Sequence, residues 1–461
     1  MLISRAMAPE PRALTVNDLI DERPPSAFQI SAIALCGCVI LFDGFDTQAM
    51  GFLVPYIAED FGIARDSFGY ALSAGLFGLM LGAMVAGPIA DRWGRKFAII
   101  VSVLVFGVLS LLTGRASSLD ELVVLRFLTG LGLGGAMPNA VSLAAEYAPK
   151  RLQPMFVSAI FVGMAGGAVV ASGVGGALIP IWGWRSVFVV GGLLPIVLAI
   201  VLFTLLPESL RFLSVIGADR KRMSAIVRRI APEAADVPLA PPPASERREG
   251  VPVKHLFTEG RALGTVLLWI PFFMNLLILY FILSWLPSLL RDAGMPASAG
   301  ISAVAAFSVG GIVGTLLQGP LMKAFGVYPP MVAEFVASLA LVALAAQTFA
   351  SFELMIVVTF GLGISVQAAQ AGLNVLAAMY YPTAMRATGV GWALGVGRIG
   401  AIVGPPIGGA MLQMHWTPRE IFLAGVVPAL ISAVTVVLSG RLQGTASPYR
   451  AEAQPAPSAV H

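Results

Sequence analysis

The stretch "GPIADRWGRK" (87–96) is a short charged segment between two long apolar runs, and a weaker copy of it occurs later in the chain. The copy, "GPLMKAFGVY" (319–328), keeps both glycines and the proline at a shift of 232 residues. At a shift of 233, "AAEYAPKR" (144–151) aligns with "AAMYYPTA" (377–384), and "WRSVFVVGGLLP" (184–195) is similar to "PREIFLAGVVP" (418–428). A near-constant shift in three separate places indicates a chain of two similar halves.

The composition is typical of a membrane protein. Of the 461 residues, 57% are hydrophobic and only 12% are charged, whereas soluble domains are about 25% charged. Apolar stretches of about 20 residues recur, each long enough to cross a hydrocarbon core of about 30 Å. They lack a period-2 alternation, so helices are expected and not a barrel. The Lys and Arg residues lie in short loops and form no aromatic-rich patch, which argues against nucleic-acid binding.

Proline, glycine and charge clusters divide the chain into twelve expected spans. These cover roughly 27–57, 67–90, 96–114, 119–146, 155–178, 186–206, 263–290, 298–322, 329–350, 354–379, 385–412 and 420–440. The expected fold is an all-α membrane protein with six-helix halves at 27–206 and 263–440, a central loop at 207–262, and tails at 1–26 and 441–461. In the loop, "ADRKRMSAIVRRI" (218–230) suits a short amphipathic surface helix, and the Pro-rich "DVPLAPPPASERREG" (236–250) suits a flexible connector.

The distribution of Lys and Arg predicts the orientation in the membrane. Outside the central loop, 12 of these residues fall on the side of the two termini. The opposite side carries five, namely Arg65, Arg115, Arg185, Arg291 and Arg419. Because positively charged loops stay in the cytoplasm, both termini are expected there, in a multi-pass protein of the inner (plasma) membrane. Residues 1–26 show no signal-peptide pattern.

These motifs resemble those of a known family. "GPIADRWGRK" closely resembles the loop motif G-x-x-x-D-[RK]-x-G-[RK]-[RK] of the major facilitator superfamily, although its second copy has Lys323 in place of the Asp. "RFLTGLGLGGAMPNA" (126–140), "EYAPKR" (146–151) and "GWRSVF" (183–188) also match the superfamily. Within it, "DGFD" (43–46), "RFLTGLGLGGAMPN" (126–139) and "GVGRIGAIVGP" (395–405) are similar to the aromatic acid:proton symporter family. That family includes permeases for 4-hydroxybenzoate, protocatechuate and benzoate.

Two acids in the first span, Asp43 and Asp46, are candidates for proton coupling. They are three positions apart and so share one helix face, where two ionised carboxylates repel each other. Intramembrane acids are expensive and usually functional, and the resemblance implies the same role. The alternative is that one acid pairs with an arginine and holds the bundle together.

Two arginines inside spans are candidates for binding the substrate carboxylate. Arg126 lies about 12 Å into the fourth span, at a depth comparable with the acids of the first span. It could hold either acid in a permanent ion pair, or offer its planar fork to a substrate carboxylate. Arg398 lies among small residues in the eleventh span, where its alternative role is to brace a neighbouring helix.

Polar side chains in the seventh and tenth spans are further candidates for the substrate site. The seventh span offers Asn275, Tyr280 and Trp285. In the tenth span Gln367, Gln370 and Asn374 lie on one helix face, which must point into the protein because unpaired amides facing lipid are costly. These residues either line a slot for the aromatic ring or cross-link helices.

The charged residues near the cytoplasmic helix ends are assigned to gating. They could clamp helix ends together in one conformation and release them in the other, and they carry no information about the substrate. The assigned residues are Gly87, Asp91, Arg92, Gly94, Arg95, Lys96, Glu146 and Arg151.

The expected function is therefore import of an aromatic carboxylate with protons by alternating access. Rival functions are proton symport of another small organic acid, drug export, and sensing of aromatic acids without transport. The partners are an aromatic acid, protons and the lipid bilayer, and a monomer is expected. No nucleophile triad, metal-ligand spacing or phosphate loop is present, so neither an enzyme nor a cofactor is expected.

Overall fold

The computed structural model describes residues 16–21, 23–215, 220–232, 253–258, 260–348, 351–381 and 385–443. Over these residues the protein is all-helical. Its first long helices are α2 (Ala27–Phe61), α3 (Gly69–Trp93), α4 (Arg95–Thr113), α5 (Leu119–Tyr147), α6 (Gln153–Trp182) and α7 (Arg185–Leu205). The later ones are α10 (Ala262–Asp292), α11 (Ala297–Phe325), α12 (Tyr328–Ala345), α13 (Phe352–Tyr380), α14 (Arg386–Gln413), and α15 (Pro418–Ala424) followed by α16 (Val426–Gln443).

Eleven helical segments of the described chain are long and apolar enough to cross a membrane. The remaining long helix, α5, has 29 residues and packs between α3 and α4, but it carries Asp120, Glu121, Arg126 and Glu146. The expected all-α, multi-span fold is confirmed. The last expected span is divided at Gly425, because Pro428 in the first turn of α16 cannot donate a backbone hydrogen bond to the preceding turn.

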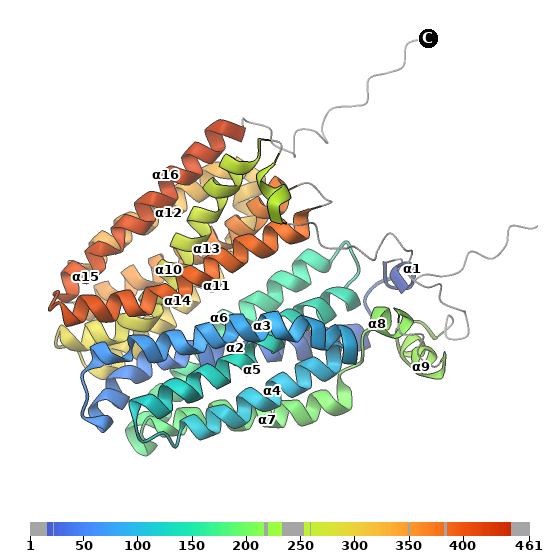
Figure 1. Ribbon diagram of the computed structural model, residues 1–461, viewed down its shortest axis with the longest axis horizontal. Coiled ribbons are helices and arrows are strands. Elements are labelled where there is room, and N and C mark those ends of the chain that lie inside the picture. The colour runs from blue at the N-terminus through green and yellow to red at the C-terminus, as the bar shows by residue number, and fades with distance from the viewer. Residues whose placement is uncertain are drawn as a thin grey trace, which may run out of the picture.

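The long helices form two groups that use the same pairings (Figure 1). In the first group α2 packs on α6, α3 on α5, and α4 on α7; in the second, α10 packs on α14, α11 on α13, and α12 on α16. The groups meet where α6 contacts α11, α3 contacts α14, and α2 contacts α10. The pairings of the second group thus repeat those of the first, in line with the repeat seen in the sequence.

Glycines let the closest helix pairs approach backbone to backbone. A Cβ on Gly78 or Gly82 of α3 would overlap the α5 backbone, and a Cβ on Gly130 or Gly134 of α5 would overlap the α3 backbone. Small residues of this kind are typical of close helix contacts in membranes. The "GLGLGG" run (130–135) therefore serves packing.

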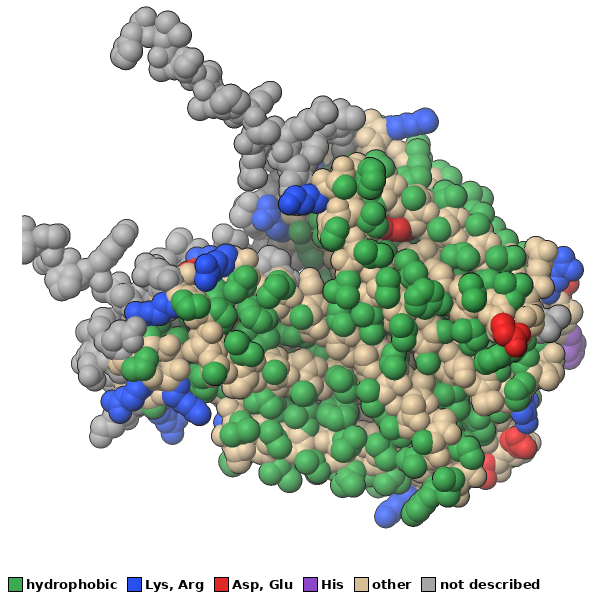
Figure 2. All heavy atoms as spheres, turned by 180° about the vertical axis from the view of Figure 1, so that it is seen from behind, with side chains coloured by type: hydrophobic (Ala, Val, Ile, Leu, Met, Phe, Trp, Pro, Cys, Tyr) green, Lys and Arg blue, Asp and Glu red, His purple; other side chains and the backbone are tan. Residues whose placement is uncertain are grey.

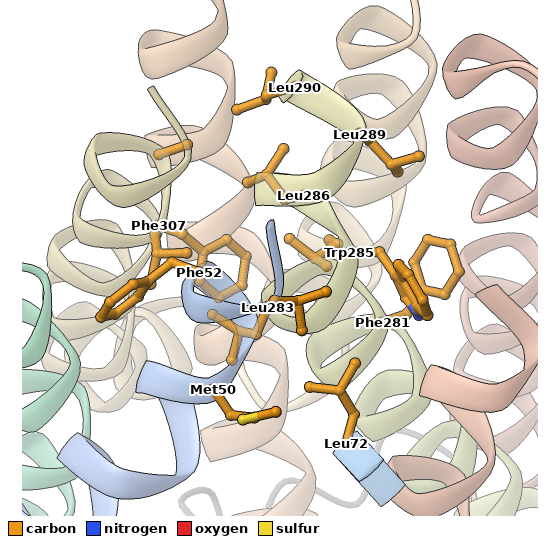
Figure 3. Close-up of a cluster of buried hydrophobic side chains, with 14 of the residues drawn as sticks. Met50, Phe52, Leu72, Phe281, Leu283, Trp285, Leu286, Leu289, Leu290 and Phe307 are labelled. Atoms are coloured by element: carbon orange, nitrogen blue, oxygen red, sulfur yellow. The ribbon is translucent and has the colours of Figure 1, made fainter. Parts of the chain in front are cut away.

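The buried hydrophobic side chains are divided unevenly along the bundle. We call the end where α2 and α10 begin the terminal end, and the opposite end the far end. At the far end one apolar cluster joins both groups, with Met50 and Phe52 of α2 near Leu283 of α10 and Phe307 of α11 (Figure 3). At the terminal end the core is split into one cluster within the first group and another within the second. The halves are thus sealed together at the far end and separate at the terminal end.

Short helices cover the terminal end of the first group. These are α1 (Val16–Asp21), α8 (Leu210–Val215) and α9 (Arg220–Ile230), and the 3₁₀ turn η4 (Val253–Phe257) lies beside the second group. Val227 and Ile230 of α9 are buried in the core of the first group, so this part of the central loop is the short amphipathic helix expected there. The expected Pro-rich connector (236–250) lies outside the described residues. The outer face is largely hydrophobic, with charged side chains gathered near its ends (Figure 2).

Candidate functional site

Asp46 on α2 and Arg126 on α5 form a buried ion pair. Nη1 of Arg126 donates to Oδ2 of Asp46 at 2.9 Å, and Nη2 donates to Oδ1 at 3.4 Å. The hydroxyl of Ser110 on α4 donates to the same Oδ1 at 3.1 Å. Asp46 is 3% exposed and Arg126 is 4% exposed. The ionised carboxylate is therefore well satisfied inside the first group of helices.

Other contacts hold the Arg126 guanidinium from the remaining sides. Nη2 lies 3.3 Å from the hydroxyl of Thr113 and 3.2 Å from that of Thr129. The guanidinium carbon also lies 5.0 Å from the ring centre of Phe188 on α7, a cation–π distance. Of the two roles considered for Arg126, the structure brings it to Asp46 as a buried, forked ion pair.

Asp43 has different surroundings, although it is only one turn away. Its Oδ1 accepts from the hydroxyl of Thr47 at 3.2 Å, while Oδ2 is buried without a hydrogen-bond partner among the described residues. Residues three apart differ by about 60° around a helix, so the two acids diverge. Asp46 faces α4 and α5, whereas Asp43 is close enough to Arg398 of α14 and Tyr280 of α10 to interact with both electrostatically.

Arg398 is the cation of the second group that faces Asp43. Its side chain is partly exposed, and it makes no hydrogen bond to any residue in the described part of the chain. Asp43 and Arg398 thus form a long-range charge pair across the two groups of helices. Such a pair can be rearranged at lower cost than the forked contact between Asp46 and Arg126.

A small cavity lies beside these charges, between α2, α3, α5 and α10, with a volume of about 30 Å³. That is room for about two water molecules, so the cavity in this conformation is too small for an aromatic ring. Its polar lining residues are Asp46, Thr47, Arg126, Tyr280 and Ser284.

The polar row on α13 is partly used to link helices. Nδ2 of Asn275 on α10 donates to Oε1 of Gln370 at 3.0 Å and to the backbone oxygen of Val366 at 3.1 Å. Gln367 points towards α11, where its side chain lies against Gly311. Oδ1 of Asn275 and Oδ1 of Asn374 are buried without hydrogen-bond partners among the described residues. The row therefore keeps unused acceptors alongside its cross-links.

Trp285 lies away from the cavity, in the contact between α10 and α14. Its indole is fully buried, and Nε1 donates to the backbone oxygen of Pro405 at 2.8 Å. Gly408 makes room for the ring, because a Cβ there would overlap it. The structure thus places this expected substrate residue in a helix contact.

Comparison with known proteins identifies the family. A family model described as Major Facilitator Superfamily matches residues 36–346 and 296–459. The 4-hydroxybenzoate transporter PcaK of Pseudomonas putida is 39% identical, over 93% of this chain and 96% of its own length. This chain belongs to the major facilitator superfamily. The gallate transporter of Pseudomonas putida (38% identical, 94% of this chain, 97% of the relative) and the benzoate transport protein of Acinetobacter baylyi (33%, 93% of each) place it among the aromatic-acid transporters.

Solved structures show the same fold. A bacterial homologue of the lysosomal transporter Spinster superimposes with a TM-score of 0.68 at 18% identity, covering 91% of this chain and 98% of that one. The xylose transporter XylE from E. coli gives a TM-score of 0.68 at 16% identity, covering 90% and 98%. These structures show the fold, and membership of the major facilitator superfamily makes the protein a multi-pass membrane transporter and not an enzyme.

The residues assigned to gating from the sequence lie at the terminal end of the first half. Asp91 pairs with Arg95 at 3.2 Å, and Nε of Arg95 lies 3.7 Å from Oε1 of Glu146. Glu146 also accepts a hydrogen bond from the hydroxyl of Ser209, immediately before α8. These contacts tie α3, α4 and α5 to the start of the central loop.

The other residues assigned to gating make local contacts or are exposed. Nζ of Lys96 donates to the backbone oxygen of Phe203, and Arg92 lies over the ring of its neighbour Trp93. Arg151 is exposed. Gly94 has a φ of 96°, which only glycine adopts without strain, and a side chain at Gly87 would meet open space.

Sequence reasoning missed Glu208, which caps α4. Its Oε1 accepts from the backbone N–H groups of Arg95 and Lys96 at 2.9 and 3.1 Å. A carboxylate is favoured there because the first N–H groups of a helix lack partners and carry partial positive charge. The only signal in the sequence was the "PES" at 207–209, more than 100 residues from the helix that it caps.

Sequence reasoning also missed two ion pairs that join the halves at the far end. Arg65 pairs with Asp292, and Nη2 of Arg291 lies 3.6 Å from Oε2 of Glu59. In each pair one residue lies in the last turn of α2 or just after it, and the other lies at the end of α10. The arginines had been counted only as outer-loop charges. They line an open recess of about 660 Å³ at the far end.

Proposed function

We propose that this facilitator imports an aromatic carboxylate of the hydroxybenzoate, protocatechuate or benzoate type together with protons, by alternating access. The observation that carries the proposal is the juxtaposition of Asp43 and Arg398 across the two halves. Asp43 has one carboxylate oxygen without a hydrogen-bond partner among the described residues. Arg398 has no hydrogen-bond partner there and faces it electrostatically.

Two carboxylates competing for one guanidinium would couple the substrate to a proton. In the empty protein Arg398 balances the charge of Asp43. When a substrate carboxylate takes Arg398, Asp43 loses its counter-charge in a site of low dielectric. A lone buried carboxylate is costly, so Asp43 takes up a proton and the site returns to neutrality. One anion and one proton then cross together.

The other candidate residues take supporting roles in this proposal. Asp46 and Arg126 stay paired and shape the first-half wall of the cavity. Tyr280 and the unused acceptors of Asn275 and Asn374 face the ring and its substituents. Gln370 holds Asn275 in place, and Gln367 supports α11. Related transporters are named for 4-hydroxybenzoate, gallate and benzoate, all of them aromatic carboxylates. This supports a ring with a single carboxylate as the substrate class.

The halves at 27–206 and 263–440 would rock around the Asp43–Arg398 charge pair. We place both termini in the cytoplasm of the inner membrane, because Lys and Arg are concentrated on their side. The terminal end is then cytoplasmic, and the present conformation is closed to the outside and separated towards the cytoplasm. The far-end ion pairs and the apolar cluster are the outer gate, and the cluster around Arg95 and Glu146 belongs to the inner gate. We expect the monomer to be the working unit.

Uptake in reconstituted liposomes tests the proposal. Labelled 4-hydroxybenzoate and protocatechuate should accumulate when a proton gradient is imposed, and an uncoupler should abolish the accumulation. Asp43→Asn should lose gradient-driven accumulation, and Arg398→Gln should lose binding as well. Asp120→Asn, an exposed aspartate in the first turn of α5, is the matched control and should behave as the wild type.

Two results would refute the mechanism. Wild-type accumulation that is insensitive to uncoupler would exclude proton symport. Wild-type accumulation in both Asp43→Asn and Arg398→Gln would show that the contact between the halves is structural. If only non-aromatic acids compete for uptake, the substrate class is wrong while the coupling scheme stands.

A further inference from the structure

A second buried acid, Glu334, lies in the other half of the protein and has no part in the scheme above. It is the seventh residue of α12, about 9 Å from the terminal end of that helix at 1.5 Å per residue. Glu334 is 9% exposed, and both carboxylate oxygens are buried without a hydrogen-bond partner in the described part of the structure. Such a group needs an explanation, because buried polar atoms are nearly always paired.

The polar side chain facing Glu334 is Gln318 of α11. Gln318 is 2% exposed, and its amide nitrogen and oxygen also lack standard hydrogen bonds to described residues. The surrounding wall is apolar, since Met322 and Met331 pack beside Gln318 where α13 comes close at Gly372. Four polar atoms without hydrogen-bond partners among the described residues are therefore buried together between α11, α12 and α13.

The fold itself does not require this acid–amide pair. At the repeat shift of 232, the first-half counterparts of Gln318 and Glu334 are Ala86 and Ser102. Ala86 and Ser102 both lie against Gly135, in the matching contact of α3, α4 and α5. The first half thus builds this helix contact from small side chains, and the second half places a carboxyl group there.

Within the described residues, no charged side chain balances Glu334 in its ionised form. The helices packed on α12 are α11, α13, α15 and α16. Their charged residues, all exposed, are Lys323, Glu353, Arg419, Glu420 and Arg441. None of them is among the groups that interact with Glu334. An ionised carboxylate would be a lone charge in the membrane-embedded core, which is strongly unfavourable.

One proton satisfies all four polar atoms at once. A neutral carboxyl group has one O–H donor and one carbonyl acceptor, and a primary amide offers the complementary acceptor and donor. The Glu334 hydroxyl can donate to Oε1 of Gln318 while Nε2 of Gln318 donates to the Glu334 carbonyl oxygen. A divalent metal cation fits poorly, because Ca²⁺ takes six to eight oxygen ligands and Mg²⁺ demands near-octahedral coordination. The described residues contain no cluster of three or more His, Cys, Asp or Glu side chains that could hold a metal.

We propose that Glu334 and Gln318 form a second proton-binding site of the transport cycle, in the second half and close to its terminal end. The site is linked to the moving parts because α11 and α13 carry the contacts around it. On α11 Ser308 meets Gln48 of the first half, and on α13 Gln370 bonds Asn275. Losing the proton removes the hydrogen bond from the Glu334 hydroxyl to Gln318 and leaves an uncompensated charge between α11 and α12, so proton release accompanies rearrangement of this half. The inference rests on the proposed proton-coupled import.

Infrared difference spectroscopy of the full-length protein in membranes tests the protonation directly. The wild type should show the C=O stretching band of a protonated buried carboxylic acid, which disappears as the pH is raised. Glu334→Gln should remove this band, and Glu353→Gln, an exposed acid of the same half, should keep it. A spectrum of Glu334→Gln that retains every protonated-acid band would overturn the proposal.

Transport by the same variants separates a cycling proton from a fixed neutral pair. In liposomes Glu334→Gln should lose gradient-driven accumulation of 4-hydroxybenzoate but keep exchange of labelled for unlabelled substrate, and Glu334→Asp should restore part of the accumulation. Wild-type accumulation by Glu334→Gln would show a permanent structural pair and would overturn the proposal. If the wild type itself shows no gradient-driven accumulation, the proposed symport fails, while the infrared result still decides whether Glu334 binds a proton.

Discussion

Replacing each acid by asparagine should distinguish their roles. Asp46→Asn should lower the stability of the protein strongly, whereas Asp43→Asn should change it little. Asp46→Asn leaves the Arg126 guanidinium, 4% exposed, without its counter-charge. Removing one partner of a buried pair costs about 3–5 kcal/mol, or roughly two to three and a half orders of magnitude in the unfolding equilibrium constant. Asp43→Asn removes a charge whose Oδ2 has no hydrogen-bond partner among the described residues. Its stability should therefore change by less than about 1 kcal/mol.

A double variant sharpens this prediction. Replacing both partners, as in Asp46→Leu with Arg126→Met, removes the lone charge and fills a similar volume, so most of the lost stability should return. Thr113 and Thr129 keep their bonds to the backbone oxygens of Leu109 and Leu125, so no new buried hydroxyl is left unpaired. The recovered stability then measures the penalty of the stranded charge.

The assay is unfolding of the purified full-length protein in detergent, followed by circular dichroism, with uptake measured on the same preparations. We expect Asp46→Asn to be clearly less stable than the wild type, and Asp43→Asn to be as stable but inactive in gradient-driven uptake. If Asp46→Asn is as stable as the wild type while Asp43→Asn is destabilised, our assignment is reversed: Asp43 is then the acid of the structural ion pair, and Asp46 is the acid that binds the proton. If the double variant is no more stable than the single one, a stranded charge is not the cause.

Three further perturbations test the gates and the packing. Exchanging the charges of Arg65 and Asp292 in one double variant should preserve uptake. Arg65→Asp alone should weaken the outer gate by about 0.2–1 kcal/mol, detectable as faster labelling of a cysteine introduced at the far end; equal labelling of both variants would contradict the pairing. Gly134→Leu should prevent folding, because a side chain there meets the backbone of α3 at Leu79, and a folded, fully active variant would refute the close contact. Glu208→Gln should lower the unfolding midpoint by loss of the charged cap of α4, about 0.5–2 kcal/mol, while Glu353→Gln at an exposed site should not.

The sequence was sufficient for the fold because membrane helices are specified by local composition. Each span is an apolar run of the right length, and its ends carry their own signals. The first helix runs to Phe61, four residues beyond its expected end at 57, because Pro55 is tolerated inside it and the left-handed Gly62 (φ 66°) ends it. Such differences leave the order and number of elements unchanged.

The local sequence does not predict in the same way which residues the charged side chains pair with. The spacing of Asp43 and Asp46 predicts a shared face, but their angular difference is enough to send one acid to α5 and the other to α14. That choice depends on how α2 is rotated among its neighbours. Residue type alone was equally ambiguous for Trp285, an aromatic that could serve a ring-binding site but bonds Pro405 instead.

Two carboxylates escaped the sequence reasoning for different reasons. Glu208 follows the last span of the first half, and its function appears only when the start of α4 is placed beside it. Glu334 is near the start of an expected span, where an acid reads as an interfacial group able to reach water. In the structure it turns into the helix contact, and both oxygens are buried. The sequence predicts how far along a helix a residue lies, but it does not predict which side of the helix faces the protein interior at that residue.

The two gates differ in chemistry, and this difference bears on how the cycle turns. Opening the far end must separate apolar side chains such as Phe52, Leu283 and Phe307, each worth about 1.5–3 kcal/mol when fully buried. In the opposite conformation, new contacts at the closed terminal end must supply a comparable stabilising free energy. The side chains gathered there, however, are polar. Asp91 is 73% exposed, and its pair with Arg95 stays within one half, so its charge is available to the second half when the halves close. The far end also holds two ion pairs, but its apolar contacts are not screened by salt. Raising the ionic strength should therefore weaken a closed terminal end more than a closed far end, and favour the conformation seen here over the opposite one.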